Sequence, residues 1–280
     1  MSTRNECLSN ADFDRLRALV YDEAGINLNS EKKTMLEIRI RRRLRNLDFT
    51  SFSDYCKYVF QPEGKEHELI HLIDAVTTNK TDFFREAGHF EFLTSKALPD
   101  LATRYGAGRR SMVWSAGGST GEEPYTLAIV LSEYAQTHSG FQFNVLATDI
   151  STAVLQKARL GIYKSELAEP VPKDLRQKYF MRSRDRNSDL VRIVPELRAR
   201  VEFRRVNFMD ADFGLAESLE MIFCRNVIIY FDRPTQVRIL RKLVRHLAPG
   251  GYFFAGHSES LQGMDLPLTP AGLAVYRKVQ

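Results

Sequence analysis

The 280-residue sequence lacks several features that mark common protein classes. It has only three cysteines, Cys7, Cys56 and Cys224, and they are far apart. This spacing predicts neither a disulfide framework nor the paired cysteines of zinc and redox sites, and we expect no metal cofactor. No apolar run is long enough to cross a bilayer, and the first ten residues contain no apolar signal region. These absences favour a protein of the reducing cytoplasm.

The chain also lacks an excess of acidic residues, since 40 Lys and Arg against 35 Asp and Glu give a net charge of +5. A mild positive charge favours an acidic partner, which is a nucleic acid, an acidic protein surface or an anionic lipid. With 44% hydrophobic residues, the chain can bury a full core. Its length predicts one large domain with a smaller one.

Residues 11–75 show helical periodicity and no strand signals. Leu16, Leu19 and Val20 form one apolar stripe. A second stripe repeats at helical spacing through Leu36, Ile40, Leu44 and Leu47, and Asn29-Ser30 is the predicted N-cap of its helix. Five arginines flank this second stripe: Arg39, Arg41, Arg42, Arg43 and Arg45. They form either a basic docking face or an ordinary solvated surface.

A polar segment follows, in which Thr77, Thr78, Asn79 and Thr81 precede the cluster Phe83-Phe84-Arg85-Glu86. Thr81 or Asp82 is the predicted N-cap of a helix that carries this cluster. A guanidinium on an apolar helix face usually has an anionic partner, so Arg85 is a candidate binding residue.

The most informative stretch is Met112–Tyr125, MVWSAGGSTGEEPY. Its order of buried strand, glycine turn and helix start is how a doubly wound sheet brings backbone amides close to a ligand. The turn differs from G-x-G-x-x-G, and Glu122 and Glu123 at the helix start would repel a pyrophosphate. These acids suit a ligand with an ammonium, a sulfonium or hydroxyl groups. Alternatively, they only stabilise the helix dipole.

From Ser111 onward, strands and helices alternate, which predicts a parallel sheet. The strand at Phe143–Ala147 leads to Asp149, an acid well placed to accept from both hydroxyls of a ribose, and Ser151 is the predicted cap of the next helix. Two later strands, Val201–Val206 and Leu219–Cys224, are also followed by polar residues at the edge where such sheets bind ligands. These residues are Asn207 with Phe208, and Arg225-Asn226 leading to Tyr230.

The alternation is interrupted from about 161 to 197, where a polar tip between two apolar flanks predicts a β-hairpin outside the main sheet. Asp232 then caps a helix that we expect to stop at Pro249-Gly250-Gly251. His257, after a further strand, is expected to be structural because no nucleophile accompanies it. Residues 274–276 are the predicted antiparallel edge strand.

Together these pieces resemble the CheR family, the S-adenosylmethionine-dependent methyltransferases of bacterial chemotaxis receptors. The matching stretches are TTNKTDFFRE (Thr77–Glu86), WSAGGSTGEEPY (Trp114–Tyr125), ATDIS (Ala147–Ser151), IFCRNVIIYFD (Ile222–Asp232) and GGYFFAGHSE (Gly250–Glu259). The resemblance implies an α/β fold, a doubly wound Rossmann-like methyltransferase sheet. It further implies a helical substrate-docking domain (1–76), a linker that contacts the cofactor (77–90) and a methyltransferase domain (91–280) with an inserted β-subdomain.

The resemblance also implies S-adenosylmethionine as cofactor, converted to S-adenosylhomocysteine, and glutamates of chemoreceptor cytoplasmic domains as substrate. The implied product is a methyl ester. The cofactor-binding residues would be Asn79, Thr81, Arg85, Glu123, Asp149, Asn207, Phe208, Arg225 and Asn226, with Arg85 and Tyr230 flanking the methyl-transfer site. We expect a cytoplasmic monomer recruited to receptor arrays by its basic helix, without nucleic acid or membrane insertion.

Two other functions are compatible with parts of the sequence. A nucleic-acid methyltransferase would suit the basic helix, but Arg225-Asn226-Val227-Ile228 lacks the prolines of the Asn/Asp-Pro-Pro-Tyr/Phe turn typical of enzymes that methylate exocyclic amines. A non-catalytic adaptor that binds S-adenosylmethionine is the other alternative. The presence of both Arg85 and Tyr230 argues against it.

Overall fold

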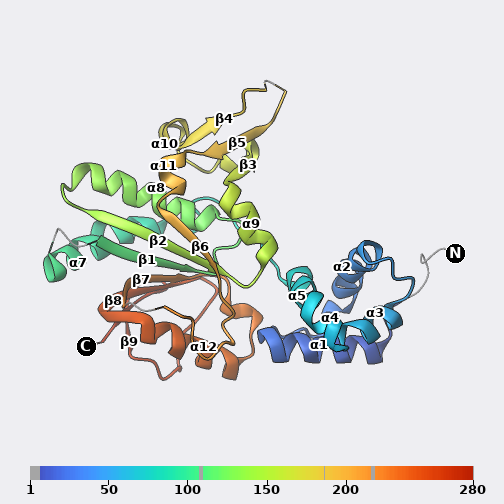
Figure 1. Cartoon of the computed structure of the whole chain (residues 1–280). Helices are drawn as coiled ribbons and strands as arrows, with labels where there is room; N and C mark the ends of the chain where they lie inside the picture. The colour runs from blue at the N-terminus through green and yellow to red at the C-terminus, as the bar shows by residue number, and fades with distance from the viewer. Residues whose placement is uncertain (1–6, 107–109, 186, 216–217, 280) are drawn as a thin grey trace.

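The protein consists of an N-terminal helical domain, a central seven-stranded sheet and a small three-stranded sheet that projects from it (Figure 1). The computed structural model describes residues 7–106, 110–185, 187–215 and 218–279. Within these ranges, no helix has both the length and the apolar character needed to span a membrane. Cys7, Cys56 and Cys224 are free thiols, as predicted.

The predicted helical N-terminal region is confirmed. The helical domain comprises α1 (Asn10–Ala24), the 3₁₀ helix η2 (Ser30–Lys32), α2 (Lys33–Asn46), α3 (Phe52–Val59), α4 (Pro62–His67) and α5 (Leu69–Val76). Both predicted stripes face the core, with Leu16 and Val20 on α1 and Leu36 and Ile40 on α2 fully inaccessible. Leu47, the last residue of the second stripe, is half-buried. The predicted cap at Asn29-Ser30 is wrong, because η2 intervenes and α2 begins without a side-chain cap.

The main sheet is doubly wound, as predicted. Its strands are β1 (Arg110–Ala116), β2 (Gln142–Asp149), β6 (Val201–Arg205), β7 (Leu219–Cys224), β8 (Leu247–Ala255), β9 (Leu268–Gly272) and β10 (Val275–Lys278). They lie in the order β6-β2-β1-β7-β8-β10-β9. The first five strands are parallel, and β10 is antiparallel to both neighbours. The predicted final strand therefore exists, but β9 rather than β10 is the edge.

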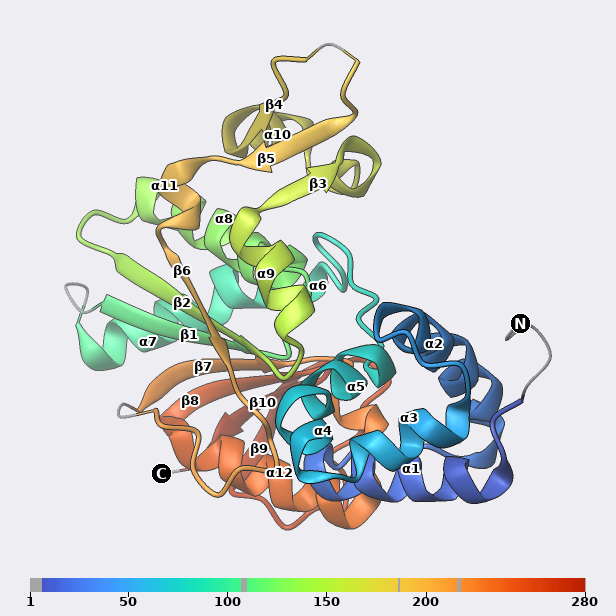
Figure 2. The same cartoon turned by 45° about the vertical axis from the view of Figure 1, so that its right-hand side comes forward.

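Helices cover both faces of this sheet (Figure 2). Helices α8 (Glu122–Thr137) and α9 (Thr152–Leu160) lie on one face, and α12 (Arg233–His246) lies on the other. The chain reaches β1 through α6 (Gly88–Phe92), the π-helical turn η3 (Leu93–Ala97) and α7 (Leu98–Tyr105). Asp232 caps α12 as predicted, accepting from the Thr235 amide at 2.9 Å. The helix ends before the predicted Pro-Gly-Gly stop, which instead lies within β8.

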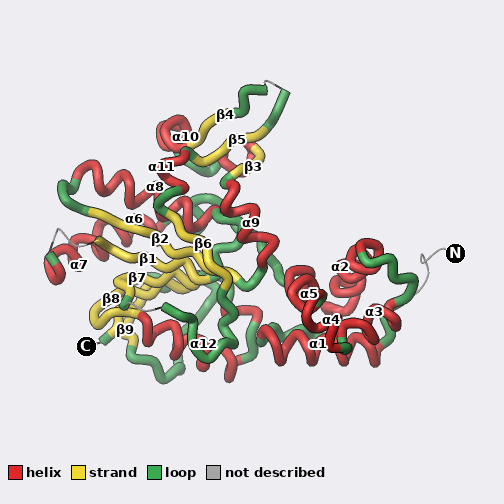
Figure 3. Tube along the Cα trace, viewed as in Figure 1, coloured by secondary structure: helices red, strands yellow, loops and turns green. Residues whose placement is uncertain are grey.

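The predicted insertion forms a separate three-stranded sheet in the order β3-β5-β4 (Figure 3). Its elements are β3 (Ile162–Lys164), the 3₁₀ helix η4 (Ser165–Ala168), α10 (Lys173–Tyr179), β4 (Phe180–Arg182), β5 (Leu190–Ile193) and α11 (Pro195–Arg198). Strands β4 and β5 make the expected antiparallel hairpin. The sequence patterns did not predict β3 and α10, since a three-residue strand is too short to show an alternating pattern.

Candidate functional site

A pocket lies where the carboxyl ends of β1, β2, β6 and β7 meet the helical domain. The empty space in this pocket, with the open solvent at its mouth included, is about 1010 Å³. Ala24 and Ile26 line it from the helical domain, and Gly117 lines it from the sheet. The structure brings together all ten candidate residues around this pocket: Asn79, Thr81, Arg85, Glu123, Asp149, Asn207, Phe208, Arg225, Asn226 and Tyr230.

The glycine turn after β1 forms one wall of the pocket. The amides of Gly117 and Gly118 both donate to the Thr148 carbonyl at 2.8 Å, which holds the turn against the end of β2. Gly117 has a φ of +93°, and a Cβ atom on it would lie 2.4 Å from Val227 Cγ2. Both the backbone angle and the available space therefore require glycine at this position.

Asp149 stands at the end of β2, as predicted, with its carboxylate facing the turn. Its Oδ2 accepts from the Ser119 amide at 3.0 Å, and its Oδ1 accepts from the Ser151 amide at 2.9 Å. Burial raises the pKa of this carboxyl, and these backbone hydrogen bonds oppose the shift. Ser151 rather than Asp149 caps α9, as predicted. Each Asp149 oxygen keeps acceptor capacity for a hydroxyl pair.

The two acids at the start of α8 have different environments. Glu122 is 3% exposed, accepts from Thr120 Oγ1 at 2.6 Å and does not belong to the pocket lining of the described chain. Glu123 lines the pocket and accepts from Ser115 Oγ at 2.6 Å. Burial raises the pKa of both carboxyls. The helix-dipole interpretation therefore fits Glu122, whereas the ligand interpretation fits Glu123.

Arg225 is the central cation of the site. Its guanidinium lies 3.4 Å from Glu123 Oε2 and 3.3 Å from Glu86 Oε2, and it donates to the Arg85 carbonyl. It also lies over the Phe90 ring, 5.4 Å from the centroid. Arg225 is buried, so two carboxylates balance its charge inside the protein. Glu86, which the sequence analysis did not assign a role, is thus part of the site.

Glu259 holds the loop that follows β7 and is a second residue that the sequence analysis missed. Its carboxylate accepts from the amides of Asn226 and Gly256 at 2.8 and 2.7 Å, and from those of Val227 and Ile228 at 2.8 and 2.9 Å. Asn226 has a φ of +58°, a left-handed conformation that Asn tolerates better than most residues. A GHSE turn after a strand is the only sequence signal for this role.

Arg85 and Tyr230 line the same pocket but come from distant parts of the chain. Arg85 lies in a turn rather than on a helix, because α6 begins only at Gly88. The predicted cap at Thr81 or Asp82 is therefore wrong. Tyr230 ends the 3₁₀ helix η5 (Ile228–Tyr230). Burial raises the pKa of its phenol, and the charge of Arg85 opposes the shift, so the hydroxyl is protonated at neutral pH.

The remaining candidates connect the pocket to the helical domain. The Asn207 amide donates to the Glu23 carbonyl of α1 at 2.6 Å, and its oxygen accepts from the Met209 amide at 3.0 Å. The side-chain amide of Asn79 donates to Thr77 Oγ1 at 3.1 Å. The backbone carbonyl of Asn79 accepts from Ser119 Oγ at 2.9 Å. The 77–82 segment thus bridges α5 and the glycine turn.

The five arginines of α2 differ in exposure and in their partners, and their role in docking stays a prediction. Arg39 donates from Nη1 to the carbonyls at the end of α5 (residues 75–77) at 2.8–3.0 Å. Arg43 forms a two-bond ion pair with Glu68, which is 1% exposed, at 2.6 and 2.8 Å. Arg41 pairs with Glu37 at 2.6 Å. Only Arg42 and Arg45 are exposed.

The sheet order and the pocket at its carboxyl edge define a Rossmann-like methyltransferase with an N-terminal helical domain. The family model "CheR methyltransferase, SAM binding domain" matches residues 79–276, and "CheR methyltransferase, all-alpha domain" matches residues 11–77. The chain belongs to the CheR methyltransferase family.

Curated relatives are similar over nearly their whole lengths. The chain is 42% identical to chemotaxis protein methyltransferase 2 of Pseudomonas aeruginosa, over 95% of this chain and 92% of that protein. It is 42% identical to the chemotaxis protein methyltransferase of Escherichia coli, over 98% and 93% respectively. The corresponding protein of Borreliella burgdorferi is 39% identical, over 90% and 89%.

Proposed function

We propose that this protein transfers a methyl group from S-adenosylmethionine to glutamate side chains in the cytoplasmic domains of chemoreceptors, and so forms glutamyl methyl esters. The observation that carries the proposal is that the ten candidate residues, drawn from five separate stretches of the chain, line one pocket. Family membership and the chemotaxis methyltransferases among the relatives support the choice of substrate.

The pocket suits S-adenosylmethionine, which when bound supplies an electrophilic methyl group on a sulfonium. Glu123 accepts from the α-ammonium of this cofactor, and Asp149 accepts from its ribose hydroxyls. Burial raises the pKa of Glu123, and the positive charge of Arg225 opposes this shift. The Gly117 turn leaves space beside Val227 that a side chain would fill.

The acceptor glutamate needs no general base. Its unperturbed pKa is about 4.3, so it is already ionised at neutral pH. The protonated phenol of Tyr230 and the guanidinium of Arg85 orient this carboxylate without protonating it. Because a strong, dedicated salt bridge would stabilise the ground state and slow transfer, Arg85 is shared between acceptor and cofactor. The remaining task of the enzyme is positioning and partial desolvation.

The exposed face of α2 docks the receptor. Arg42 and Arg45 are exposed, and Ile38, 64% exposed, lies one turn before Arg42 on the same side of the helix. This mixed basic and apolar face is complementary to an acidic, glutamate-rich helix. The enzyme acts as a cytoplasmic monomer that is recruited to receptor arrays, and its binding of S-adenosylmethionine needs residues from one chain only.

The decisive experiment offers radiolabelled S-adenosylmethionine together with receptor cytoplasmic domains, DNA or RNA. We expect base-labile label in the receptor domains, since glutamyl methyl esters hydrolyse in alkali. The Asp149→Ala variant should show much less label because it loses the ribose acceptor. Label in nucleic acid would instead identify a nucleic-acid methyltransferase. Cofactor binding without any transfer would identify an adaptor, and either result would refute the proposal.

A further inference from the structure

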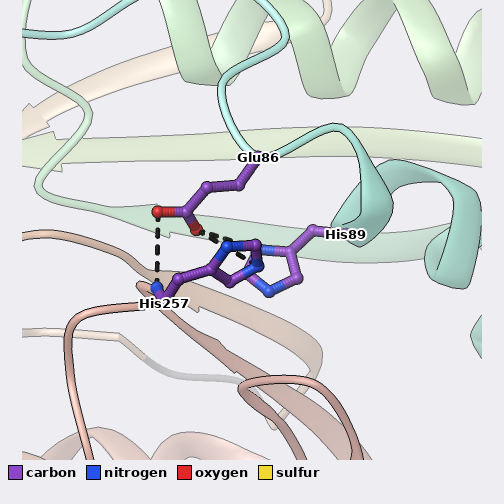
Figure 4. A group of neighbouring side chains, drawn as sticks. All are labelled: Glu86, His89 and His257. Atoms are coloured by element: carbon purple, nitrogen blue, oxygen red, sulfur yellow. Dashed lines mark hydrogen bonds and ion pairs between the residues drawn. The ribbon is translucent and has the colours of Figure 1, made fainter.

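We propose that Glu86, His89 and His257 form a binding site for a divalent transition-metal ion such as Zn²⁺, next to the cofactor pocket. Figure 4 shows the three side chains converging from different parts of the chain. Glu86 comes from the turn before α6, His89 from α6 and His257 from the loop after β8. One donor atom from each residue can be chosen so that all three lie within 4.8 Å of one another. The expectation that the chain has no metal site rested on cysteine spacing, which does not detect such a cluster.

Two buried acceptor atoms face each other in this cluster without a hydrogen atom between them. His89 is 1% exposed, and its Nε2 lies 3.2 Å from the Leu273 carbonyl, to which it can only donate. The other ring nitrogen, Nδ1, is therefore left with a lone pair in the neutral ring. Nδ1 lies 3.5 Å from Glu86 Oε2, and neither atom has a hydrogen-bond partner. A bound cation would turn this unfavourable contact into a favourable one.

A proton on His89 Nδ1 would serve the same purpose, but the surroundings disfavour it. Burial and the nearby charge of Arg225 lower the pKa of His89 to about 4. The ring is therefore neutral at physiological pH, which is the form that binds metals.

The geometry suits a borderline metal ion. Two imidazoles and one carboxylate are ligands typical of Zn²⁺, whereas Ca²⁺ and Mg²⁺ prefer oxygen ligands. In a tetrahedral zinc site, bond lengths of about 2.0–2.2 Å place ligand atoms about 3.3–3.5 Å apart. Glu86 Oε2 lies 3.5 Å from His89 Nδ1 and 3.9 Å from His257 Nε2. Because one donor atom from each residue lies within 4.8 Å of the other two, a bound ion would draw the three side chains closer together.

Two further features of the cluster are those of a metal site. The Leu273 carbonyl fixes the His89 tautomer, as outer-shell partners do for metal-binding histidines. The backbone amide of His257 lies 3.3 Å from Glu86 Oε1 and orients the carboxylate. The His257 side chain is 40% exposed, so the ion has an entry path and the fourth position is left for water.

Metal binding should also affect the cofactor pocket. This effect rests on the proposed function, whereas the metal site itself does not. Glu86 Oε2 is also the atom 3.3 Å from Arg225, which lines the cofactor pocket. A metal on this oxygen competes with Arg225 for it and repels the guanidinium. Metal and cofactor should therefore each weaken the binding of the other by the same factor.

The site is tested by titrating the purified chain, without cofactor, with Zn²⁺ against a chromophoric chelator and with Co²⁺ in an absorption spectrometer. We expect one equivalent to bind, with Co²⁺ bands of a nitrogen and oxygen site and no thiolate charge-transfer band, which excludes Cys7 as a ligand. His257→Ala should weaken binding at least tenfold. Because 40% of the His257 side chain is exposed, this variant should fold, which circular dichroism will check.

His71→Ala is the matched control, since His71 is an exposed histidine on α5, outside the cluster. Its affinity for Zn²⁺ should equal that of the wild type, and Glu86→Gln should reduce the affinity as His257→Ala does. Absence of saturable binding, or undiminished binding by His257→Ala, would overturn the metal site.

The coupling is tested by calorimetric titration with S-adenosylhomocysteine, with and without saturating Zn²⁺. We expect Zn²⁺ to raise the Kd several-fold in the wild type and to leave it unchanged in His257→Ala. An unchanged Kd in the metal-loaded wild type would overturn the coupling. Failure of the proposed function would appear as absent methyl transfer and would leave the metal titration unaffected.

Discussion

At the scale of single residues, the pocket is organised by charges that only partly neutralise one another. Glu123 and Glu86 both face Arg225, and Asp149 and Glu259 are each held by backbone amides. Burial disfavours ionised carboxylates. A buried carboxylate therefore destabilises the empty pocket unless a cation or a hydrogen-bond donor offsets the cost of burying its charge. We infer that the positions of Glu123 and Asp149, which line the pocket, are kept for ligand binding rather than for stability.

The first prediction concerns Tyr230→Phe, which removes only the hydroxyl that we assign to the acceptor carboxylate. A hydrogen bond to a charged group contributes about 1.5–3 kcal/mol, so kcat should fall roughly 10- to 100-fold. The affinity for S-adenosylhomocysteine should stay within about twofold, as measured by calorimetry. Tyr276→Phe on β10 is the matched control and should leave both quantities unchanged. If Tyr230→Phe turns over like the wild type, Tyr230 is a packing residue.

The second prediction concerns Glu122, whose pKa is raised above its unfolded value by burial, with the Thr120 hydroxyl opposing. The folded chain thus holds this proton more strongly than the unfolded chain. The corresponding stability is fully present below the unfolded pKa and is lost as the pH rises through the folded pKa. Glutamine has no proton to lose at this position. The free energy of unfolding of Glu122→Gln should therefore increase relative to that of the wild type as the pH rises above the unfolded pKa of about 4.3.

Urea unfolding across this pH range measures the difference for Glu122→Gln, with the exposed Glu169→Gln as a control that should track the wild type. A difference for Glu122→Gln that does not grow with pH would contradict the assignment of burial as the dominant effect.

The sequence was sufficient to predict those pocket residues whose place in the fold follows from the strands and turns next to them in the chain. Glu123 follows a strand and a glycine turn, and Asp149 ends the next strand, so parallel-sheet geometry alone brings them to one edge. The role of Glu86 depends instead on Arg225, and that of Glu259 on the amides after β7, which lie far from these residues along the chain. The hydrophobic periodicity of a sequence contains no information about such long-range contacts, so these roles became apparent only in the structure.

At the scale of elements, α2 shows why an arginine-rich helix is ambiguous in sequence. The partners of Arg39 and Arg43 lie 25 to 38 residues further along the chain, on α5 and directly before and after it. These two arginines fasten α2 to α5, whereas Arg42 and Arg45 on the other side of the helix are exposed. Charge reversal at Arg43 would therefore test folding rather than docking, since breaking a buried ion pair costs about 3–5 kcal/mol. Charge reversal at Arg39 would test folding too, because it removes the donor to the carbonyls at the end of α5.

The third prediction is that Arg42→Glu combined with Arg45→Glu raises the KM for receptor several-fold at low ionic strength. Each exposed contact contributes about 0.2–1 kcal/mol, and salt screens it, so the difference from the wild type should shrink as salt is added. Cofactor affinity and the unfolding midpoint should not change. The same charge change on α12, Arg241→Glu with Arg245→Glu, is the control. A KM equal to that of the wild type at low salt would show that this face is only solvated surface.

At the scale of the whole molecule, the helical domain and the main sheet share one hydrophobic core. A continuous buried cluster runs from Leu16 on α1 through Trp114 on β1 to Leu240 on α12. Hydrogen bonds cross the same boundary, such as the one from the Tyr21 hydroxyl to Asp232 at 2.6 Å. Because the pocket is lined from both sides of this boundary, a bound ligand contacts both parts. We therefore expect the two parts to unfold together.

The last prediction tests this cooperativity with two probes. Trp114 is the only tryptophan and is fully buried in the sheet, so its fluorescence reports on the main domain, while far-UV circular dichroism also detects α1–α5. We expect coincident urea transitions, and S-adenosylhomocysteine at 100 times its Kd should stabilise both by about 2.7 kcal/mol. Tyr21→Phe should destabilise both equally, since it removes the hydrogen bond to Asp232 that crosses the boundary. If the circular dichroism transition precedes the fluorescence transition, the helical domain unfolds independently and the shared core does not couple the two parts.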